Sequence, residues 1–278
     1  MKLKIVTAVM IFITSAVIYL WNENSQGGVM ADTESEGISK KTVCLGRYLI
    51  GLPAGAEISF GGTVFDGWKI SSDDTEDIEE FKLRLLKRET ELAAAKNENN
   101  CHSLESARKI DGEISEGKIF IFDRKRNHHW EGDKRIVHES TAIEGLIRID
   151  PVSYRFFIEF GTGERADQLK RVIDRLRYRK KDEIPDQSGF CFENGFLLDP
   201  VPRLRPVEHV FMFAGYPHRP DVAITLGSMS GITMDKTLLQ RDAESALNAK
   251  YPSNFFTIFK GPREINGIPG EEASERIR

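Results

Sequence analysis

The sequence lacks the short motifs that mark the common catalytic and metal sites. Gly-x-Ser-x-Gly, whose sharp turn exposes a nucleophilic serine, does not occur, and the similar string from Gly227 to Gly231 has Met229 at its centre. Neither His-Glu-x-x-His nor Cys-x-x-Cys is present. His128 and His129 are adjacent, but neighbours on a strand point to opposite faces, which makes them poor joint ligands. We therefore predict no catalytic residue, no metal site and no cofactor.

One glycine-rich turn, Gly161 to Ala166, has the spacing of a dinucleotide-binding fingerprint between an expected strand and an expected helix. In a nucleotide-binding unit the helix leads to an apolar strand that ends in an acidic residue. Here the helix leads instead to a charged run from Arg177 to Asp186. We interpret the turn as an ordinary helix start.

The chain has no excess of positive charge. Its formal net charge is -4, with 40% hydrophobic and 29% charged residues, which is typical of a soluble globular protein. A nucleic-acid partner is therefore not expected, because such partners select a basic surface. The 278 residues are enough for about two domains of ordinary size.

Long hydrophobic runs are rare, but one stands at the N-terminus. Lys2 and Lys4 precede a mainly apolar stretch from Ile5 to Trp21, close to the length that spans a bilayer. We interpret residues 1–22 as a signal anchor in the inner membrane, held through residues 5–21. Cleavage of a signal peptide is the alternative, because Val29 to Ala31 resembles a peptidase site. Either alternative places the remainder of the chain outside the cytoplasm.

Cysteine is scarce, with only Cys44, Cys101 and Cys191. In an oxidising compartment three cysteines can give one disulfide and one free thiol. Spacing does not determine the pairing. We expect a bridge between Cys44 and Cys101, inside one domain, with three separate thiols as the alternative.

Composition and turn residues divide the chain into segments. Residues 23–41 are polar and predict a flexible tether, 42–181 an N-terminal α+β domain, 182–189 a linker and 190–278 a C-terminal α+β domain. The stretch from Cys44 is echoed from Cys191, and Arg108 to Gly112 is echoed by Arg263 to Gly267. The expected fold class is therefore α+β, with two related modules of mainly antiparallel sheet and amphipathic helices.

Periodicity locates the elements within these domains. The expected strands are 42–50, 63–70, 117–123, 135–142, 145–150, 154–160, 207–213 and 222–226. A first helix follows a cap formed by Asp73 and Glu76, and its apolar face carries Ile78, Phe81, Leu85 and Leu92. A second helix has an apolar stripe of Ala166, Leu169, Val172, Ile173 and Leu176, with cations from Arg175 to Lys181 at its end. A third helix is expected at 236–250.

A basic segment around a tryptophan is the candidate partner-binding surface. It runs from Arg124 to Arg135 and is expected to form a loop between two strands. Exposed Trp and Arg side chains are where binding energy concentrates in interfaces. The alternative is a solvated hairpin whose tryptophan folds back on the core. The candidate residues are Arg124, Lys125, Arg126, His128, His129, Trp130 and Arg135.

Three segments carry a resemblance to a known family. Thr42 to Pro53 (TVCLGRYLIGLP), Gly189 to Asp199 and Gly261 to Glu272 resemble segments of immunity proteins cognate to lipase effectors of the type VI secretion system. The resemblance implies a two-domain periplasmic protein that binds a toxic phospholipase and protects the cell that makes it. It implies no catalytic residues, because the family is inhibitory.

The same resemblance implies a longer C-terminal domain. We expect the second module to be incomplete after Glu272, so that the strand following Gly267 pairs incompletely.

A membrane-anchored envelope scaffold or adaptor without an enzyme target is the alternative function, since it would have the same anchor and domains.

Overall fold

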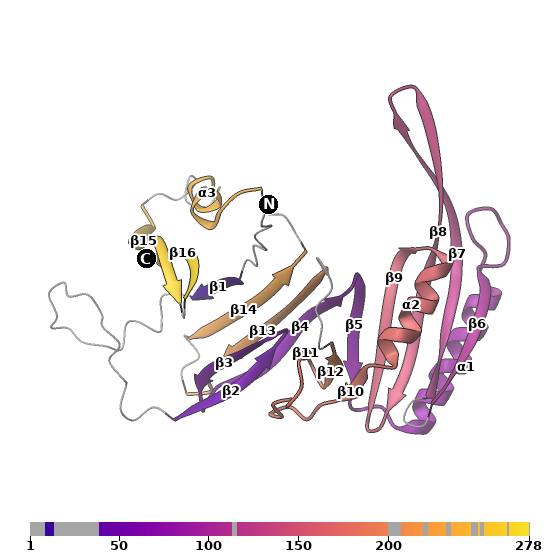
Figure 1. Cartoon of the computed structure of the whole chain (residues 1–278), viewed down its shortest axis with the longest axis horizontal. Coiled ribbons are helices and arrows are strands. Elements are labelled where there is room, and N and C mark those ends of the chain that lie inside the picture. The colour runs from indigo at the N-terminus through magenta and orange to yellow at the C-terminus, as the bar shows by residue number, and fades with distance from the viewer. Residues whose placement is uncertain are drawn as a thin grey trace, which may run out of the picture. The chain divides into compact units, whose positions relative to one another are not determined.

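The protein is built mostly of antiparallel strands with few helices, as the sequence predicted (Figure 1). The computed structural model describes residues 9–13, 39–112, 116–199, 207–218, 222–231, 235–245, 250, 253–265 and 267–277. These residues form two compact units, each of which is discontinuous in sequence. Unit 1 comprises Met1–Val43, Leu49–Gly61 and His209–Arg278, and unit 2 comprises Cys44–Tyr48 and Gly62–Glu208.

Unit 2 contains an antiparallel sheet in the order β5-β9-β8-β7-β6, with β4 (Glu57–Phe65) beside β5. Its elements are β5 (Trp68–Asp73), α1 (Ile78–Ala94), β6 (Leu104–Asp111), β7 (Glu116–Glu131), β8 (Lys134–Ile149), β9 (Val152–Gly161), α2 (Gly163–Ile173), β10 (Leu176–Tyr178), β11 (Gly189–Phe192) and β12 (Gly195–Leu198). The last three form a small sheet in the order β10-β12-β11.

The two long helices cover opposite faces of the main sheet of unit 2. Along β8, Leu146 packs in the cluster that contains Phe81 and Leu85 of α1. Its neighbour Gly145 faces the other way, where an added Cβ would lie 2.8 Å from Leu169 of α2. Since successive residues of a strand point to opposite faces, the sheet is sandwiched between α1 and α2.

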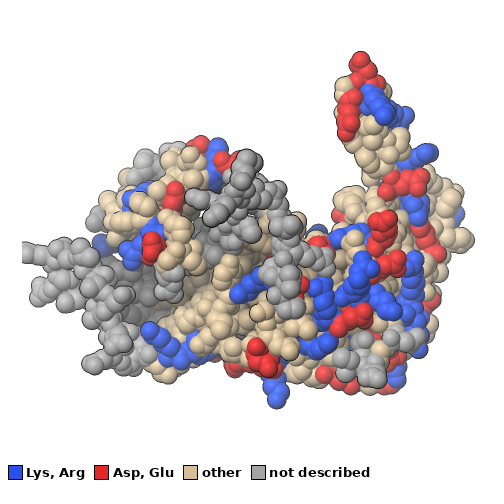
Figure 2. All heavy atoms as spheres, viewed as in Figure 1, with Lys and Arg blue, Asp and Glu red and all other residues tan. Residues whose placement is uncertain are grey.

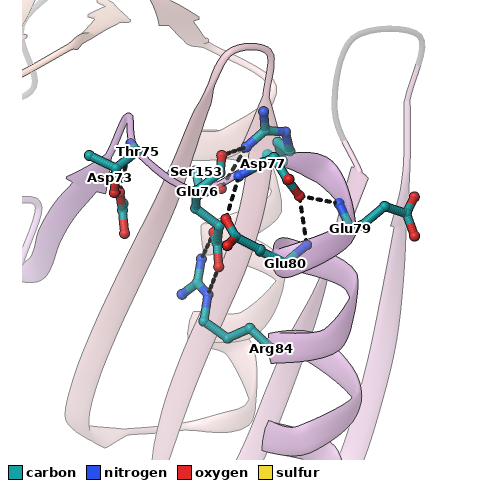
Figure 3. A network of polar contacts seen from close by, with 9 residues as sticks. Asp73, Thr75, Glu76, Asp77, Glu79, Glu80, Arg84 and Ser153 are labelled. Atoms are coloured by element: carbon teal, nitrogen blue, oxygen red, sulfur yellow. Dashed lines mark hydrogen bonds and ion pairs between the residues drawn. The ribbon is translucent and has the colours of Figure 1, made fainter.

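Helix α1 begins one turn later than the sequence predicted. Its cap is Asp77, whose carboxylate accepts from the backbone N–H groups of Glu79 (2.8 Å) and Glu80 (2.9 Å), as Figure 3 shows. The Glu80 carboxylate accepts from the Asp77 N–H in return, which completes a capping box. Asp73 ends β5 and accepts from Thr75, and these hydrogen bonds lower the pKa of its carboxyl. The expected buried face is confirmed at Phe81, Leu85 and Leu92.

Helix α2 buries Ala166, Leu169, Val172 and Ile173 of the predicted stripe, whereas Leu176, which we expected on the helix, is buried in β10. The helix ends at Ile173, so the cations that follow do not sit on its last turn as expected. Arg179 lies beyond β10 and is buried, and it donates to the carbonyls of Phe192 (2.8 Å) and Glu183 (3.1 Å). Burial lowers the pKa of this guanidinium. The side chain therefore holds the β11–β12 hairpin and is not part of a helix end.

Two segments that were expected to be single strands are hairpins. β2 (Lys40–Leu45) turns into β3 (Tyr48–Pro53) at Gly46, where φ is +57°. β4 (Glu57–Phe65) turns into β5 at Asp66 and Gly67, where φ is +52° and +81°. A two-residue loop with positive φ at both positions matches the twist of the flanking strands, which is why Asp-Gly is a hairpin signal.

Unit 1 contains strands in the order β1-β14-β13-β4 and a separate β15–β16 hairpin. Its further elements are β1 (Val9–Ile13), β13 (Glu208–Gly215), β14 (Ala223–Ser230), α3 (Leu238–Ala243), β15 (Phe255–Ile265) and β16 (Ile268–Ile277). The third expected helix is thus described over only part of 236–250, since residues 246–249 lie outside the described residues. β16 pairs with β15 along its whole length in a two-stranded sheet, and the incomplete second module that we expected stays a prediction.

The N-terminal segment differs from the expected membrane helix where the structure describes it. Within residues 5–21 only Val9–Ile13 is described, and it forms a strand antiparallel to β14. The remainder of the expected anchor lies outside the described residues, as do the possible cleavage site from Val29 to Ala31 and most of the expected tether. Among the residues that are described, no helix has the length and apolar character needed to cross a membrane.

The disulfide joins Cys44 to Cys191, so the expected bridge from Cys44 to Cys101 is wrong. The β2–β3 and β11–β12 hairpins meet at this point, and Gly46 and Cys191 exchange backbone hydrogen bonds of 2.9 and 2.7 Å. Cys101 is an exposed free thiol in the turn after α1, where its N–H donates to the side chain of Asn97. Both cysteine-containing segments of the sequence echo therefore form hairpins, while a relation between two modules stays a prediction.

Candidate partner-binding arm

The basic segment around Trp130 is a two-stranded arm and not the loop that we expected (Figure 1). We call residues 124–140 the arm. β7 and β8 pair with each other from Lys125 and Ser140 to Glu131 and Lys134, whereas the pairing of β6 with β7 ends at Phe122. The side chains are buried below this point and mainly exposed above it. The arm therefore projects from the sheet of unit 2 with solvent on both faces.

Local backbone geometry starts and ends the arm. The register shifts between Phe122 and Lys125, and Asp123 between them has φ of +54°, as in a bulge that increases strand twist. The hairpin loop consists of Gly132 and Asp133, with φ of +60° at the glycine. Glycine in the first position of a two-residue loop is the signature of a type II′ turn. These two features bend the strands away from the sheet and then reverse them.

One face of the arm, the tryptophan face, carries Arg126, His128, Trp130, Arg135, Val137 and Glu139. Cross-strand partners share a face, and the register pairs Trp130 with Arg135 and His128 with Val137. Trp130 is 62% exposed and Val137 is 43% exposed. Within the described part of the chain, the side chains of His128, Trp130 and Arg135 form no hydrogen bond or ion pair. Arg126 lies 4.0 Å from Glu139 on the same face. This face thus presents apolar groups and one cation, Arg135, that form no polar contact within the described residues.

The opposite face, the histidine face, carries Lys125, Asn127, His129, Glu131, Lys134, Ile136, His138 and Ser140. The rings of His129 and His138 stack with centroids 4.7 Å apart, and Nε2 of His138 lies 2.8 Å from Nδ1 of His129. Nε2 of His129 lies 3.1 Å from the carboxylate of Glu131. Most hydrogen-bonding groups near the tip of this face are therefore already paired with one another.

Ion pairs fix the base of the arm. Arg124 donates to Glu105 of β6 through Nε and Nη2 (2.8 and 2.7 Å), and this raises the pKa of its guanidinium. Lys125 lies 3.1 Å from Asp123, which raises the pKa of its ammonium group. Figure 2 shows side chains of both charge signs along the arm. Arg124 and Lys125 therefore brace the base of the arm.

The structure divides the seven candidate residues into three groups. Arg126, His128, Trp130 and Arg135 lie together on the tryptophan face, His129 lies on the opposite face, and Arg124 and Lys125 lie at the base. Val137 was missed by the sequence analysis, because an isolated valine is recognised only once the register places it beside His128. In the part of the chain that the structure describes, no three His, Cys, Asp or Glu side chains are placed to hold a metal ion.

Two family descriptions match the chain in succession. The Tle cognate immunity protein 4 N-terminal domain matches residues 41–179, and the Tle cognate immunity protein 4 C-terminal domain matches residues 183–277. A comparison with curated proteins found no match.

Solved structures of similar fold include two from Pseudomonas aeruginosa. The apo structure of the immunity protein TplEi of T6SS has 22% identity and a TM-score of 0.64 over 84% of this chain and 75% of that chain. TplEi complexed with "L" peptide has 23% identity and a TM-score of 0.62, over 84% and 74%. The crystal structure of the Tle4–Tli4 complex gives 23% identity and a TM-score of 0.65, over 84% and 74%. At these identities the structures support the fold, and the two matched domains show that the chain belongs to the Tle cognate immunity protein 4 family.

Proposed function

We propose that this chain binds and inhibits a phospholipase effector of the type VI secretion system in the periplasm, and so protects the cell that makes it. The observation that carries the proposal is the succession of the two family matches, which together run from residue 41 to residue 277. The chain acts by occupying the effector, and no residue of it takes part in a reaction. The division into domains at 42–181 and 190–278, joined by residues 182–189, is part of the same proposal.

Two features support export from the cytoplasm. The first is the apolar stretch after Lys2 and Lys4, which has the character of a signal peptide or signal anchor. The second is the buried Cys44–Cys191 disulfide, since disulfides persist in oxidising compartments such as the bacterial periplasm. We propose that the segment directs the chain across the inner membrane. N-terminal sequencing of the mature protein distinguishes a retained anchor from a cleaved signal.

The arm is the proposed contact surface. Arg126, His128, Trp130 and Arg135 are exposed on one face, and Trp and Arg are the residues enriched at interface hot spots. Arg124, Lys125 and His129 contribute by holding the arm in shape. An arm of this kind can block the entrance to the effector's substrate site or the movement of its lid.

Co-expression tests the function directly. The full chain and a candidate lipase effector of the type VI secretion system are produced in one bacterial host, with the lipase directed to the periplasm. We expect survival with the chain and lysis without it, and recovery of a complex by affinity capture of the lipase. The purified complex should hydrolyse phospholipid vesicles more slowly than the free lipase.

The control is an unrelated lipase of the same compartment, against which the chain should give no protection. Failure to form a complex by a folded sample would contradict the proposal and favour the envelope scaffold. Binding without inhibition would indicate an adaptor that recognises the effector and leaves its activity intact.

A further inference from the structure

The two faces of the arm differ in what a partner would have to displace. On the histidine face, a partner would compete with the contact between His129 and His138 and with the contact between His129 and Glu131. A hydrogen bond lost within the arm offsets one gained with the partner, so little net binding results. On the tryptophan face, His128, Trp130 and Arg135 have no such contact among the described residues. A partner that contacts these three side chains therefore breaks no existing polar contact of theirs, and nothing offsets the new interaction.

The composition of the tryptophan face indicates the chemistry of its partner. Trp130 and Val137 are large apolar side chains held in water, and burying them removes apolar surface from solvent. Arg135 is the direct cross-strand partner of Trp130, so a pocket that receives the indole meets a guanidinium at its rim. Guanidinium groups bind carboxylates with two parallel hydrogen bonds. Arg126 is a second cation further down the same face, but it already lies 4.0 Å from the carboxylate of Glu139.

Charge also separates the arm from the remainder of the chain. Residues 124–140 contain five Lys or Arg and three Asp or Glu, whereas the whole chain has a formal net charge of -4. Since opposite charges steer association, an acidic partner surface is drawn to this arm in preference to the body of the protein.

We propose that the tryptophan face enters an apolar pocket on the effector whose rim carries carboxylate groups, with Trp130 inside the pocket and Arg135 on a rim carboxylate. The histidine face stays in solvent and stiffens the ribbon. A two-stranded hairpin without a third strand is marginally stable in water, so its cross-strand contacts decide how rigid it is. A stiff arm loses less conformational freedom on binding. This inference rests on the proposed function, because the pocket belongs to the effector.

Adjacent residues of opposite faces provide a matched test. Arg135 and Lys134 are both exposed cations at the tip, and neither forms an ion pair with the described residues. Arg135→Glu and Lys134→Glu therefore make the same charge reversal one residue apart, on the tryptophan and histidine faces respectively. Calorimetry with the full chain and the candidate lipase effector measures Kd. We expect Arg135→Glu and Trp130→Ala each to weaken binding at least about tenfold, and Lys134→Glu to change it by less than about threefold.

Equal weakening by Arg135→Glu and Lys134→Glu would overturn the face assignment, because only the net charge of the arm would then matter. Unchanged binding of Trp130→Ala would overturn the pocket. Circular dichroism of each variant establishes that the sheet is intact before binding is compared. Vesicles of anionic lipid test the other source of negative charge, and binding to them that is lost equally in both charge variants would assign the arm to the membrane. If wild type does not bind the lipase at all, the proposed function fails and this inference fails with it.

Discussion

Removing the Cys44–Cys191 disulfide should lower the free energy of unfolding of unit 2 by about 3–5 kcal/mol. The two cysteines are 147 residues apart. In the loop-closure model the bridge acts on the unfolded chain, and a loop of this length corresponds to about 5 kcal/mol at room temperature. Measured losses for native disulfides are roughly 2–5 kcal/mol, so the lower part of the range allows for residual structure in the unfolded state.

The variant for this test is the double change of Cys44 and Cys191 to Ala. It should still fold, because Arg47 holds the same junction through ion pairs to Asp199 (2.5 Å) and Glu208 (2.6 Å). Cys101→Ala is the matched control, since Cys101 is an exposed free thiol. Wild type treated with a reducing agent should lose as much stability as the double variant, while the control should be unaffected.

Urea unfolding followed by tryptophan fluorescence measures the effect. Trp68 is fully buried in unit 2, so its emission shifts to the red when this unit unfolds, whereas Trp130 is already exposed. The difference in midpoint multiplied by the slope of the transition gives the change in free energy of unfolding. Equal midpoints for wild type and the double variant under oxidising conditions would refute the pairing. A loss of stability of the same size in Cys101→Ala would also refute it.

Three smaller predictions follow from single side chains. Asp77→Ala removes the cap of α1 and should cost about 1 kcal/mol in urea unfolding, whereas the exposed neighbour Asp74→Ala should cost nothing measurable. Burial lowers the pKa of His209 in the folded chain. As the pH falls below about 6.5, this histidine therefore takes up a proton in the unfolded chain before it does so in the folded chain, and the free energy of unfolding decreases. His209→Gln should reduce the difference in urea midpoint between pH 7.5 and 5.5. His138→Ala removes the ring stack on the histidine face and should make trypsin cut the arm faster, while the thermal midpoint of the sheet stays the same. An unchanged cleavage rate in the last variant would show that the stack does not stiffen the arm.

The sequence by itself determined the elements whose side chains repeat with a regular period. Phe81, Leu85 and Leu92 recur at helical spacing, and the structure buries all three beneath α1. The stripe of α2 was found in the same way. Burial of an apolar face is a local pattern that every turn of the helix repeats, so it can be recognised without knowing the fold. The short segments near Cys44 and Cys191 were likewise sufficient to indicate the family.

Local pattern was ambiguous where two sites fitted the same rule. Asp73 with Glu76 and Asp77 with Glu80 both have the spacing of a capping box, and we predicted the first as the cap. In the structure Asp73 still belongs to β5, so only Asp77 is free to cap the helix. The pairing of β5 with β9 extends to Asp73, and it therefore determines that Asp77 caps α1.

Tertiary structure alone decided the contacts between distant residues. Cys44 pairs with Cys191 because two hairpins far apart in the sequence meet, and no local property of Cys101 excluded it. The arm forms because residues 125–131 pair with 134–140. The second of these strands was predicted at 135–142, but the exposed, mainly polar side chains of 125–131 gave no sign of the first. Its division into a tryptophan face and a histidine face depends on that register. A shift of one residue would exchange the faces, so only the pairing itself could assign Trp130 and Arg135 to one surface.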